Sequence, residues 1–139
     1  SLGEFCSLVA SFEHFGETHQ NQTAELLATT LDEAIGQHLE NSREPSRNVN
    51  ELDTRGSHFY LALYWAQAVA EQSKDEGLQA QFAKLAQELE ANEAKIIDEL
   101  NGAQGPAMDI GGYYYPDSEK MTAAMRPSAT LNAILDGVA

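Results

Sequence analysis

The sequence contains a single cysteine and few basic residues, and its longest hydrophobic run is short. Cys6 has no second cysteine to pair with, which excludes an intrachain disulfide and a cysteine metal cage. There are 22 acidic residues and 8 basic ones, which give a formal net charge of -14. Because this charge repels phosphate backbones and anionic lipids, neither nucleic acid nor a membrane surface is an expected partner. A lone cysteine is typical of a reducing compartment, so we expect a cytoplasmic protein.

Short motifs of familiar chemistry are also missing. The sequence has no glycine-rich phosphate loop of the dinucleotide or nucleotide-triphosphate type, no serine nucleophile elbow and no His-Glu-x-x-His zinc pattern. His14 and His19 lie five positions apart across an expected helix end, which argues against a zinc site. Adjacent acids such as Asp32 and Glu33 point to different faces of a helix. We therefore expect solvated charge at these positions rather than a metal site or an acid-base pair.

Apolar residues recur at helical spacing along most of the chain, and no alternating run of β-branched residues occurs. A length of 139 residues suits one domain. We therefore predict an all-α fold with residues 1–139 as a single unit: a helical bundle around a buried central helix, with an irregular glycine- and tyrosine-rich loop before short C-terminal helices. The expected helices cover residues 2–15, 23–40, 54–73, 75–100, 118–125 and a final stretch opened by Pro127.

The first two helices are expected to pack as an antiparallel pair. Gly16 is the expected left-handed stop of the first helix. An apolar stripe begins at Leu2 without a start methionine, which suggests that the chain was cut from a longer one. The predicted inward stripe of the second helix consists of Ala24, Leu27, Ala28, Leu31, Ile35 and Leu39.

Residues 59–70 are the most hydrophobic stretch, because all but Gln67 are apolar or aromatic. A helix that is apolar all round must be surrounded by protein. These twelve residues are too few to cross a bilayer, which needs about twenty. We therefore predict that the stretch is the buried centre of the bundle, with Asp53 or Thr54 capping its first turn.

A polar segment, residues 41–58, precedes the central helix and holds three of the four arginines. Near a helix N-terminus, the planar guanidinium groups of arginines can bind a phosphate or another anion through paired N–H donors. The alternative is a set of surface ion pairs of little energy, which the spacing alone favours. His58 is expected to form a hydrogen bond at the helix start rather than to act as a general base. The candidate side chains are Ser42, Arg43, Ser46, Arg47, Arg55, Ser57 and His58.

Three consecutive tyrosines, residues 113–115, follow the double glycine Gly111-Gly112. Aromatic side chains on a loop can stack on the ring of a ligand. A loop packed on the helical bundle is the more common arrangement, and we expect it here.

Four stretches of the sequence resemble one known family. They are Pro45-Ser46-Arg47, residues 53–66, residues 109–114, and residues 125–129 with Asn132. Together with the rest of the chain, and in the same order, they are similar to the C-terminal end of the monomeric type of NADP-dependent isocitrate dehydrogenase. Members of that family are several times longer. They convert isocitrate to 2-oxoglutarate by oxidative decarboxylation in the tricarboxylic acid cycle, with NADP and with magnesium or manganese.

The resemblance implies that isocitrate and the metal are bound by residues upstream of the matched part, so no catalytic and no metal-binding residue is assigned here. It implies one cofactor-binding residue, Arg47, which holds the 2′-phosphate of NADP. Arg55 and His58 are assigned to the helix start, and Arg43 to surface ion pairs. The implied partner is the remainder of the same enzyme chain, and the isolated piece is expected to be inactive. The alternative is an independent acidic helical module that binds a basic partner.

Overall fold

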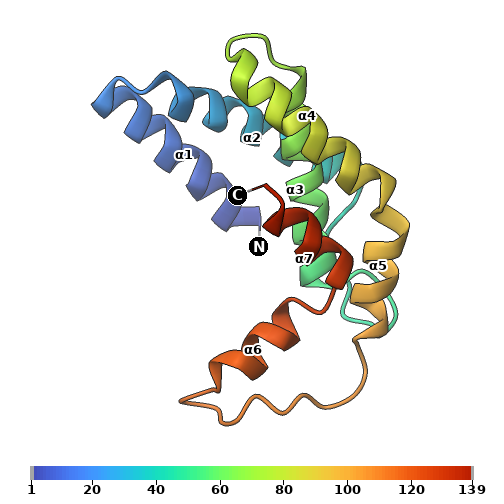
Figure 1. Ribbon diagram of the computed structural model, residues 1–139. Helices are drawn as coiled ribbons and strands as arrows, with labels where there is room; N and C mark the ends of the chain where they lie inside the picture. The colour runs from blue at the N-terminus through green and yellow to red at the C-terminus, as the bar shows by residue number, and fades with distance from the viewer. Residues whose placement is uncertain (1, 139) are drawn as a thin grey trace.

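The computed structural model describes residues 2–138, and every regular element in that range is an α-helix. The helices are α1 (Leu2–His19), α2 (Gln22–Glu40), α3 (Thr54–Glu71), α4 (Glu76–Ala91), α5 (Glu93–Gly102), α6 (Ser118–Met125) and α7 (Ala129–Asp136). α1 and α2 form an antiparallel hairpin, α3 packs between α2 and α4, and α7 contacts α4 and α5 (Figure 1). The predictions of an all-α fold and of an antiparallel first pair are confirmed.

α3 is the buried centre of this bundle. The carboxylate of Asp53 caps its first turn by accepting hydrogen bonds from the backbone N–H groups of Arg55 at 2.9 Å and Gly56 at 3.1 Å. Buried residues lie on all sides of α3, and those between Phe59 and Ala66 join one core cluster with side chains from α1, α2, α4 and α5. The prediction for the central helix is confirmed. Its buried residues are Gly56, Ser57, Phe59, Tyr60, Leu61, Leu63, Tyr64, Ala66, Ala68 and Val69.

α1 continues past Gly16 to His19, so the prediction that Gly16 ends the helix is wrong. Gly16 is buried, and a Cβ atom there would lie 2.5 Å from Cγ of Glu25 and 3.1 Å from its backbone nitrogen. The glycine is therefore needed for the close approach of α1 and α2. The chain turns instead at Gln20, where φ is 52°.

The predicted helix over residues 75–100 is divided at Asn92 into α4 and α5. The side-chain amide of Asn92 donates a hydrogen bond to the backbone carbonyl of Glu88 at 2.8 Å. Asparagine interrupts helices in this way because its short side chain competes for the local backbone groups. Apolar periodicity continues across the break, which is why the sequence pattern indicated one helix.

The end of α2 faces the core differently from the prediction. Leu39 is 45% exposed, whereas its neighbour His38 is buried. Nε2 of His38 lies 3.0 Å from the hydroxyl oxygen of Ser57, and its Nδ1 is buried without a hydrogen-bond partner in the described structure. Both positions continue the helical spacing from Ile35, and the Ser57 hydroxyl on α3 gives the imidazole the polar contact that it needs when buried.

We expect the protein to lose stability as the pH falls below about 6.5 because of His38. Burial lowers the pKa of this imidazole below its ordinary value, since the charged form would lose its hydration. As the pH falls, the unfolded chain therefore takes up a proton at this histidine before the folded chain does. The stability that comes with the neutral imidazole is present at neutral pH and is lost as the pH falls below the pKa of histidine in the unfolded chain. Urea unfolding at pH 7.5, 6.5 and 5.5 measures this loss.

His38→Gln removes the titrating group and is expected to flatten the decrease in unfolding free energy between pH 7.5 and 5.5. His19→Gln is the matched control, because His19 is exposed at the end of α1. It is expected to leave the slope unchanged. Equal slopes for wild type and His38→Gln would contradict the assignment.

Candidate functional site

The loop between α2 and α3, residues 41–53, carries Arg47 and is fastened by its own polar groups. The backbone N–H of Ser46 donates to the carbonyl of Leu52 at 2.7 Å, which closes the loop into a ring. The Ser46 hydroxyl donates to the carboxylate of Glu51 and accepts from the N–H of Asn48 at 3.1 Å. The hydrogen bond from the Ser46 hydroxyl, and a second from the side-chain amide of Asn48 at 3.2 Å, lower the pKa of Glu51. Arg47 is thus presented by an ordered loop tip.

Gln104, just after α5, fixes the other side of the loop. Its side-chain oxygen accepts a hydrogen bond from the N–H of Asn50 at 2.7 Å, and its side-chain nitrogen donates to the carbonyl of Glu51 at 2.8 Å. A hollow of about 290 Å³ lies between the two segments and includes Arg47 and Met108 in its lining. The sequence analysis did not identify Gln104, because no local pattern indicates a contact between segments so far apart in the chain.

Arg47 is exposed, and its guanidinium has no hydrogen-bond or ion-pair partner within residues 2–138. The other three arginines each have a side-chain partner: Tyr64 for Arg43, Asp53 for Arg55, and Asp136 for Arg126. A guanidinium offers five N–H donors in a planar fork that matches a phosphate group. Arg47 is therefore the arginine that is free to bind an anion.

Arg55 uses its donors inside the chain. Its guanidinium forms an ion pair with Asp53 at 2.6 Å and donates to the backbone carbonyl of Ala124 at 2.7 Å. It also reaches the carbonyl of Leu100 at 3.4 Å. Arg55 thus ties the start of α3 to the ends of α5 and α6, in agreement with its assignment to the helix start. The carboxylate of Asp53 already accepts the first N–H groups of α3, which weakens that end of the helix as a site for another anion.

Arg43 lies against aromatic rings, so the expectation of a surface ion pair is wrong. Its guanidinium carbon is 3.9 Å from the centre of the Tyr60 ring, and its Nε donates to the hydroxyl of Tyr64 at 3.1 Å. Tyr60 in turn donates to the carboxylate of Glu93 at 2.7 Å. Burial, together with this carboxylate, raises the pKa of Tyr60 to about 12, so the hydroxyl stays protonated. Arg43 therefore attaches the beginning of the loop to α3.

We expect Arg43→Ala to reduce the free energy of unfolding by about 1–3 kcal/mol, since it removes a cation–π contact and a hydrogen bond. Arg47→Ala, four positions along the same loop, is the matched control. It is expected to change the unfolding free energy by less than about 0.5 kcal/mol, because an exposed side chain without partners adds little stability. Urea unfolding of the two variants measures both effects. A larger loss for Arg47→Ala would contradict the division of roles.

His58 and the tyrosines have different outcomes. Nδ1 of His58 donates to the backbone carbonyl of Thr54 at 2.6 Å, in agreement with its expected place at the helix start.

The expectation that the tyrosine loop packs on the bundle is wrong. Tyr113, Tyr114 and Tyr115 are 87%, 86% and 93% exposed.

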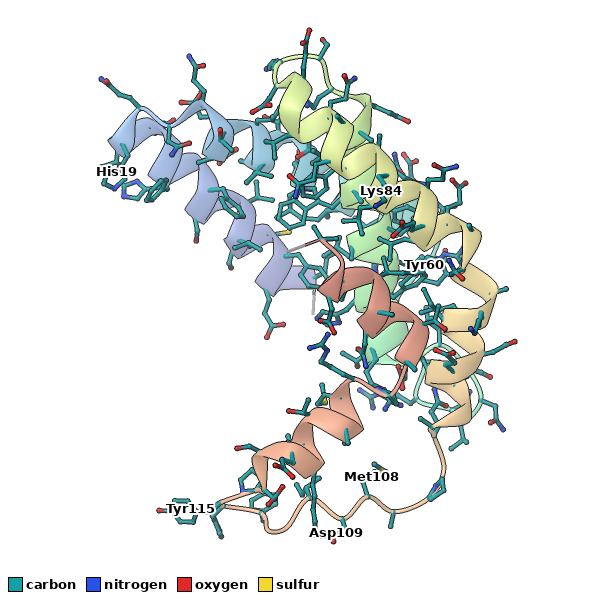
Figure 2. All side chains as sticks on the ribbon, in the orientation of Figure 1. His19, Tyr60, Lys84, Met108, Asp109 and Tyr115 are labelled. Carbon is teal, nitrogen blue, oxygen red and sulfur yellow. The ribbon has the colours of Figure 1, made fainter. Side chains whose placement is uncertain are left out.

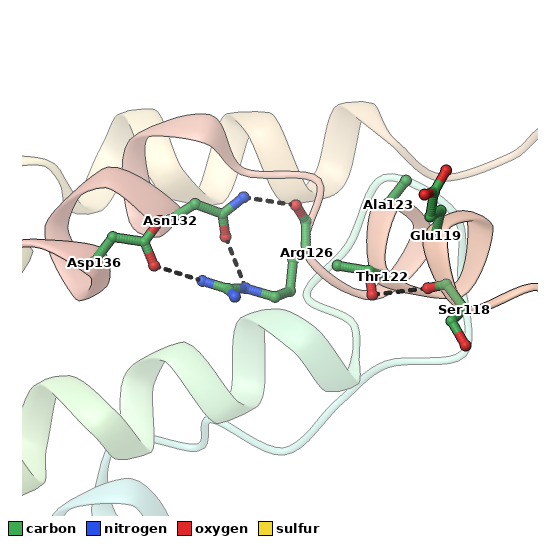
Figure 3. A pocket seen from close by; sticks show the side chains of 7 residues that line it. All are labelled: Ser118, Glu119, Thr122, Ala123, Arg126, Asn132 and Asp136. Carbon is green, nitrogen blue, oxygen red and sulfur yellow. Dashed lines mark hydrogen bonds and ion pairs between the residues drawn. The ribbon is translucent and has the colours of Figure 1, made fainter.

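A second hollow, of about 510 Å³, lies between α6 and α7 (Figure 3). Arg126 crosses it and donates to the side-chain oxygen of Asn132 at 3.1 Å and to Asp136 at 3.5 Å. The amide of Asn132 donates back to the carbonyl of Arg126 at 2.9 Å. Because Asp136 already balances the charge of Arg126, this hollow is a weaker anion site than the one beside Arg47.

Two searches of the described residues bear on other kinds of site. Within residues 2–138, no group of three or more His, Cys, Asp or Glu side chains is arranged to hold a metal ion. Over the same range, no helix combines the length and the apolar character needed to span a bilayer.

The model of one protein family, described as monomeric isocitrate dehydrogenase, matches residues 1–136. The chain belongs to the monomeric isocitrate dehydrogenase family. It is 56% identical over 135 residues to isocitrate dehydrogenase [NADP] of Azotobacter vinelandii, which is 97% of this chain and 18% of that protein. It is also 55% identical to isocitrate dehydrogenase [NADP] 2 of Colwellia maris, over 99% of this chain and 19% of the relative. The Mycobacterium tuberculosis protein of the same name is 54% identical, over 99% of this chain and 18% of that protein.

The match to the monomeric isocitrate dehydrogenase family confirms the resemblance found in the motifs, and it decides against an unrelated interaction module. The chain spans less than a fifth of the length of these relatives, at 18–19%. The free arginine and the loop that carries it therefore correspond to only one part of these longer relatives.

Proposed function

We propose that this chain is the C-terminal part of an NADP-dependent isocitrate dehydrogenase, and that Arg47 binds the 2′-phosphate of NADP. The observation that supports the proposal is the free guanidinium of Arg47, the only arginine in residues 2–138 without a side-chain partner. The relatives carry NADP in their names, and the 2′-phosphate is the group that distinguishes NADP from NAD. A planar guanidinium on an ordered loop fits that group in charge and in shape.

In this proposal the residues of the chain bind the 2′-phosphate and orient the cofactor, and they take no part in the chemical step. Arg47 donates hydrogen bonds to the phosphate oxygens, while Ser46, Glu51 and Gln104 hold the loop in place. Because the loop is already ordered, little conformational entropy is lost when the phosphate arrives. NADP supplies the hydride-accepting chemistry when it is bound. The chain thereby contributes to selection of the cofactor.

The remaining steps of the proposed reaction belong to other parts of the enzyme. Isocitrate and a magnesium or manganese ion are held by residues outside this chain, and the whole enzyme converts isocitrate to 2-oxoglutarate by oxidative decarboxylation in the cytoplasm. Residues 1–139 act as one unit against the remainder of the same polypeptide. The description of the family as monomeric supports an arrangement in which that polypeptide covers the surface of the unit. On this view the chain alone is inactive.

Substitution of Arg47 in the full-length enzyme, with NADP and NAD compared as cosubstrates, tests the proposal. A selective loss of NADP affinity is the expected result. An unchanged KM for NADP would overturn the assignment of the phosphate to Arg47.

A further inference from the structure

Residues 103–126, which we call the arm, leave the end of α5, extend away from the helical body and return through α6 to α7 (Figure 1). None of the residues of α6 is buried. Tyr113, Tyr114 and Tyr115 are the aromatic residues of the arm, at 86–93% exposure, and Tyr115 lies at its far end (Figure 2). Met108 adds an apolar side chain that is 55% exposed. The arm therefore presents aromatic and apolar side chains outside the core.

The arm has a defined shape of its own. The backbone N–H of Asp117 donates to the carbonyl of Ile110 at 2.7 Å, which closes the turn that carries the tyrosines. Lys120 forms an ion pair with Asp109, and the carboxylate of Asp117 caps α6. Gly111 has a φ of 82°, and a Cβ atom there would lie 2.8 Å from Cβ of Asp117. The turn therefore requires glycine, and local bonds on either side of the tyrosines hold the turn that carries them.

The arm is attached to the body at its two ends. Gln104 binds the loop that carries Arg47, and the carbonyl of Ala124 accepts a hydrogen bond from Arg55. Between these anchors, the hydrogen bonds and ion pairs of residues 105–123 stay within the arm, and none joins them to the rest of the described chain. An ordered segment with this much uncovered aromatic surface is typical of an interface, because a tyrosine can bury its ring while its hydroxyl keeps a polar partner.

The lengths of the relatives indicate what covers the arm. The matched residues make up 18% of the Azotobacter vinelandii protein, so more than four fifths of such an enzyme lies outside this chain. We propose that the arm is a docking surface for another part of the same polypeptide, outside residues 1–139, with the three tyrosines as its central contact. This inference rests on the proposed function only in taking the chain to be part of the longer enzyme.

The side chains of the arm define the chemistry of the surface that receives them. Three adjacent aromatic rings require an apolar surface, and their hydroxyl groups require carbonyl or carboxylate acceptors at its edge. Tyr113 and Tyr114 meet edge to face, with ring centres 5.2 Å apart, so they form one wide contact rather than two separate ones. The charges of Asp109 and Lys120 already balance each other. The part of the receiving surface that faces the tyrosines is therefore apolar.

Nitration of the native full-length enzyme by tetranitromethane, with sites located by mass spectrometry, tests the proposal. The chain has 5 tyrosines, and Tyr60 and Tyr64 are buried in the core, which makes them internal controls for an intact fold. We expect Tyr113, Tyr114 and Tyr115 to react at least tenfold more slowly in the native enzyme than in urea. Rates for these three that equal the unfolded rates, with Tyr60 and Tyr64 still protected, would overturn the docking.

The molar mass by light scattering in the same sample identifies what covers the arm. Protection at the mass of one chain supports docking within the polypeptide. Protection that disappears on dilution, together with the mass of a dimer, would show that a second copy covers the arm and would overturn the proposed occupant. The Arg47→Ala enzyme is nitrated in parallel and is expected to show the same protection. The tyrosine result and the NADP result can therefore fail independently.

Discussion

Arg47→Ala in the full-length enzyme is expected to raise the KM for NADP about ten- to a hundredfold. Hydrogen bonds between a charged donor and a charged acceptor contribute about 1.5–3 kcal/mol, and each 1.4 kcal/mol corresponds to a factor of about ten in affinity. On the proposed function, the contact with the 2′-phosphate is remote from the reacting atoms and is the same in the ground state and the transition state. The turnover number should therefore change much less than the KM. Steady-state kinetics at saturating isocitrate measures both quantities.

Two controls separate phosphate binding from a general loss of structure. With NAD as the cosubstrate there is no 2′-phosphate, so Arg47→Ala should leave the kinetic parameters measured with NAD nearly unchanged. Arg47→Lys keeps the charge but loses the planar fork, and an intermediate KM for NADP is expected. Equal losses with NADP and NAD would show that the side chain supports the loop and does not bind the phosphate.

Leu31→Ala is expected to reduce the free energy of unfolding by about 2–5 kcal/mol, whereas Leu39→Ala should cost less than about 1 kcal/mol. The two substitutions remove the same atoms from the same helix. Leu31 is 0% exposed in the core, so its truncation leaves a cavity, whereas Leu39 is 45% exposed. Because a typical domain has only about 5–15 kcal/mol of stability, the Leu31 variant should unfold at a much lower urea concentration.

This pair also compares the predicted stripe of α2 with the observed one, since the sequence pattern placed both leucines inward. Urea unfolding followed by circular dichroism gives the two values. Similar losses for Leu31→Ala and Leu39→Ala would mean that residue 39 is covered in solution, against the structure.

Much of the fold could be predicted because the decisive patterns are local. The stretch 59–70 is apolar on all sides, so its burial requires no knowledge of its neighbours. Asp53 and Pro45 likewise mark the boundaries of a helix and a loop by their own backbone chemistry. The exposed loop that carries Arg47 follows from these boundaries, and the resemblance to a family then singled out Arg47 within it.

The sequence predictions were wrong where the local pattern permits two structures and a contact with a distant residue determines which one forms. Helical spacing permits either His38 or Leu39 on the inner face of α2, and the hydroxyl of Ser57 on α3 favours the histidine. Gly16 looks like a helix stop, but it is a point of close approach to Glu25. The brace from Gln104 to Glu51 joins residues 53 positions apart, and no pattern of short period indicates such a contact.

Among the described residues, Arg47 makes no contact that stabilises the bundle, so stability and ligand binding depend on different residues here, whereas in many proteins one residue serves both. Its guanidinium supports no neighbouring side chain in the described structure, so replacing it leaves the packing of the helices intact. On the proposed function, the preference for one nicotinamide dinucleotide over the other can then change by mutation at a single surface position without a prior gain in stability. Enzymes with this arrangement are suitable starting points for directed evolution toward the unphosphorylated coenzyme.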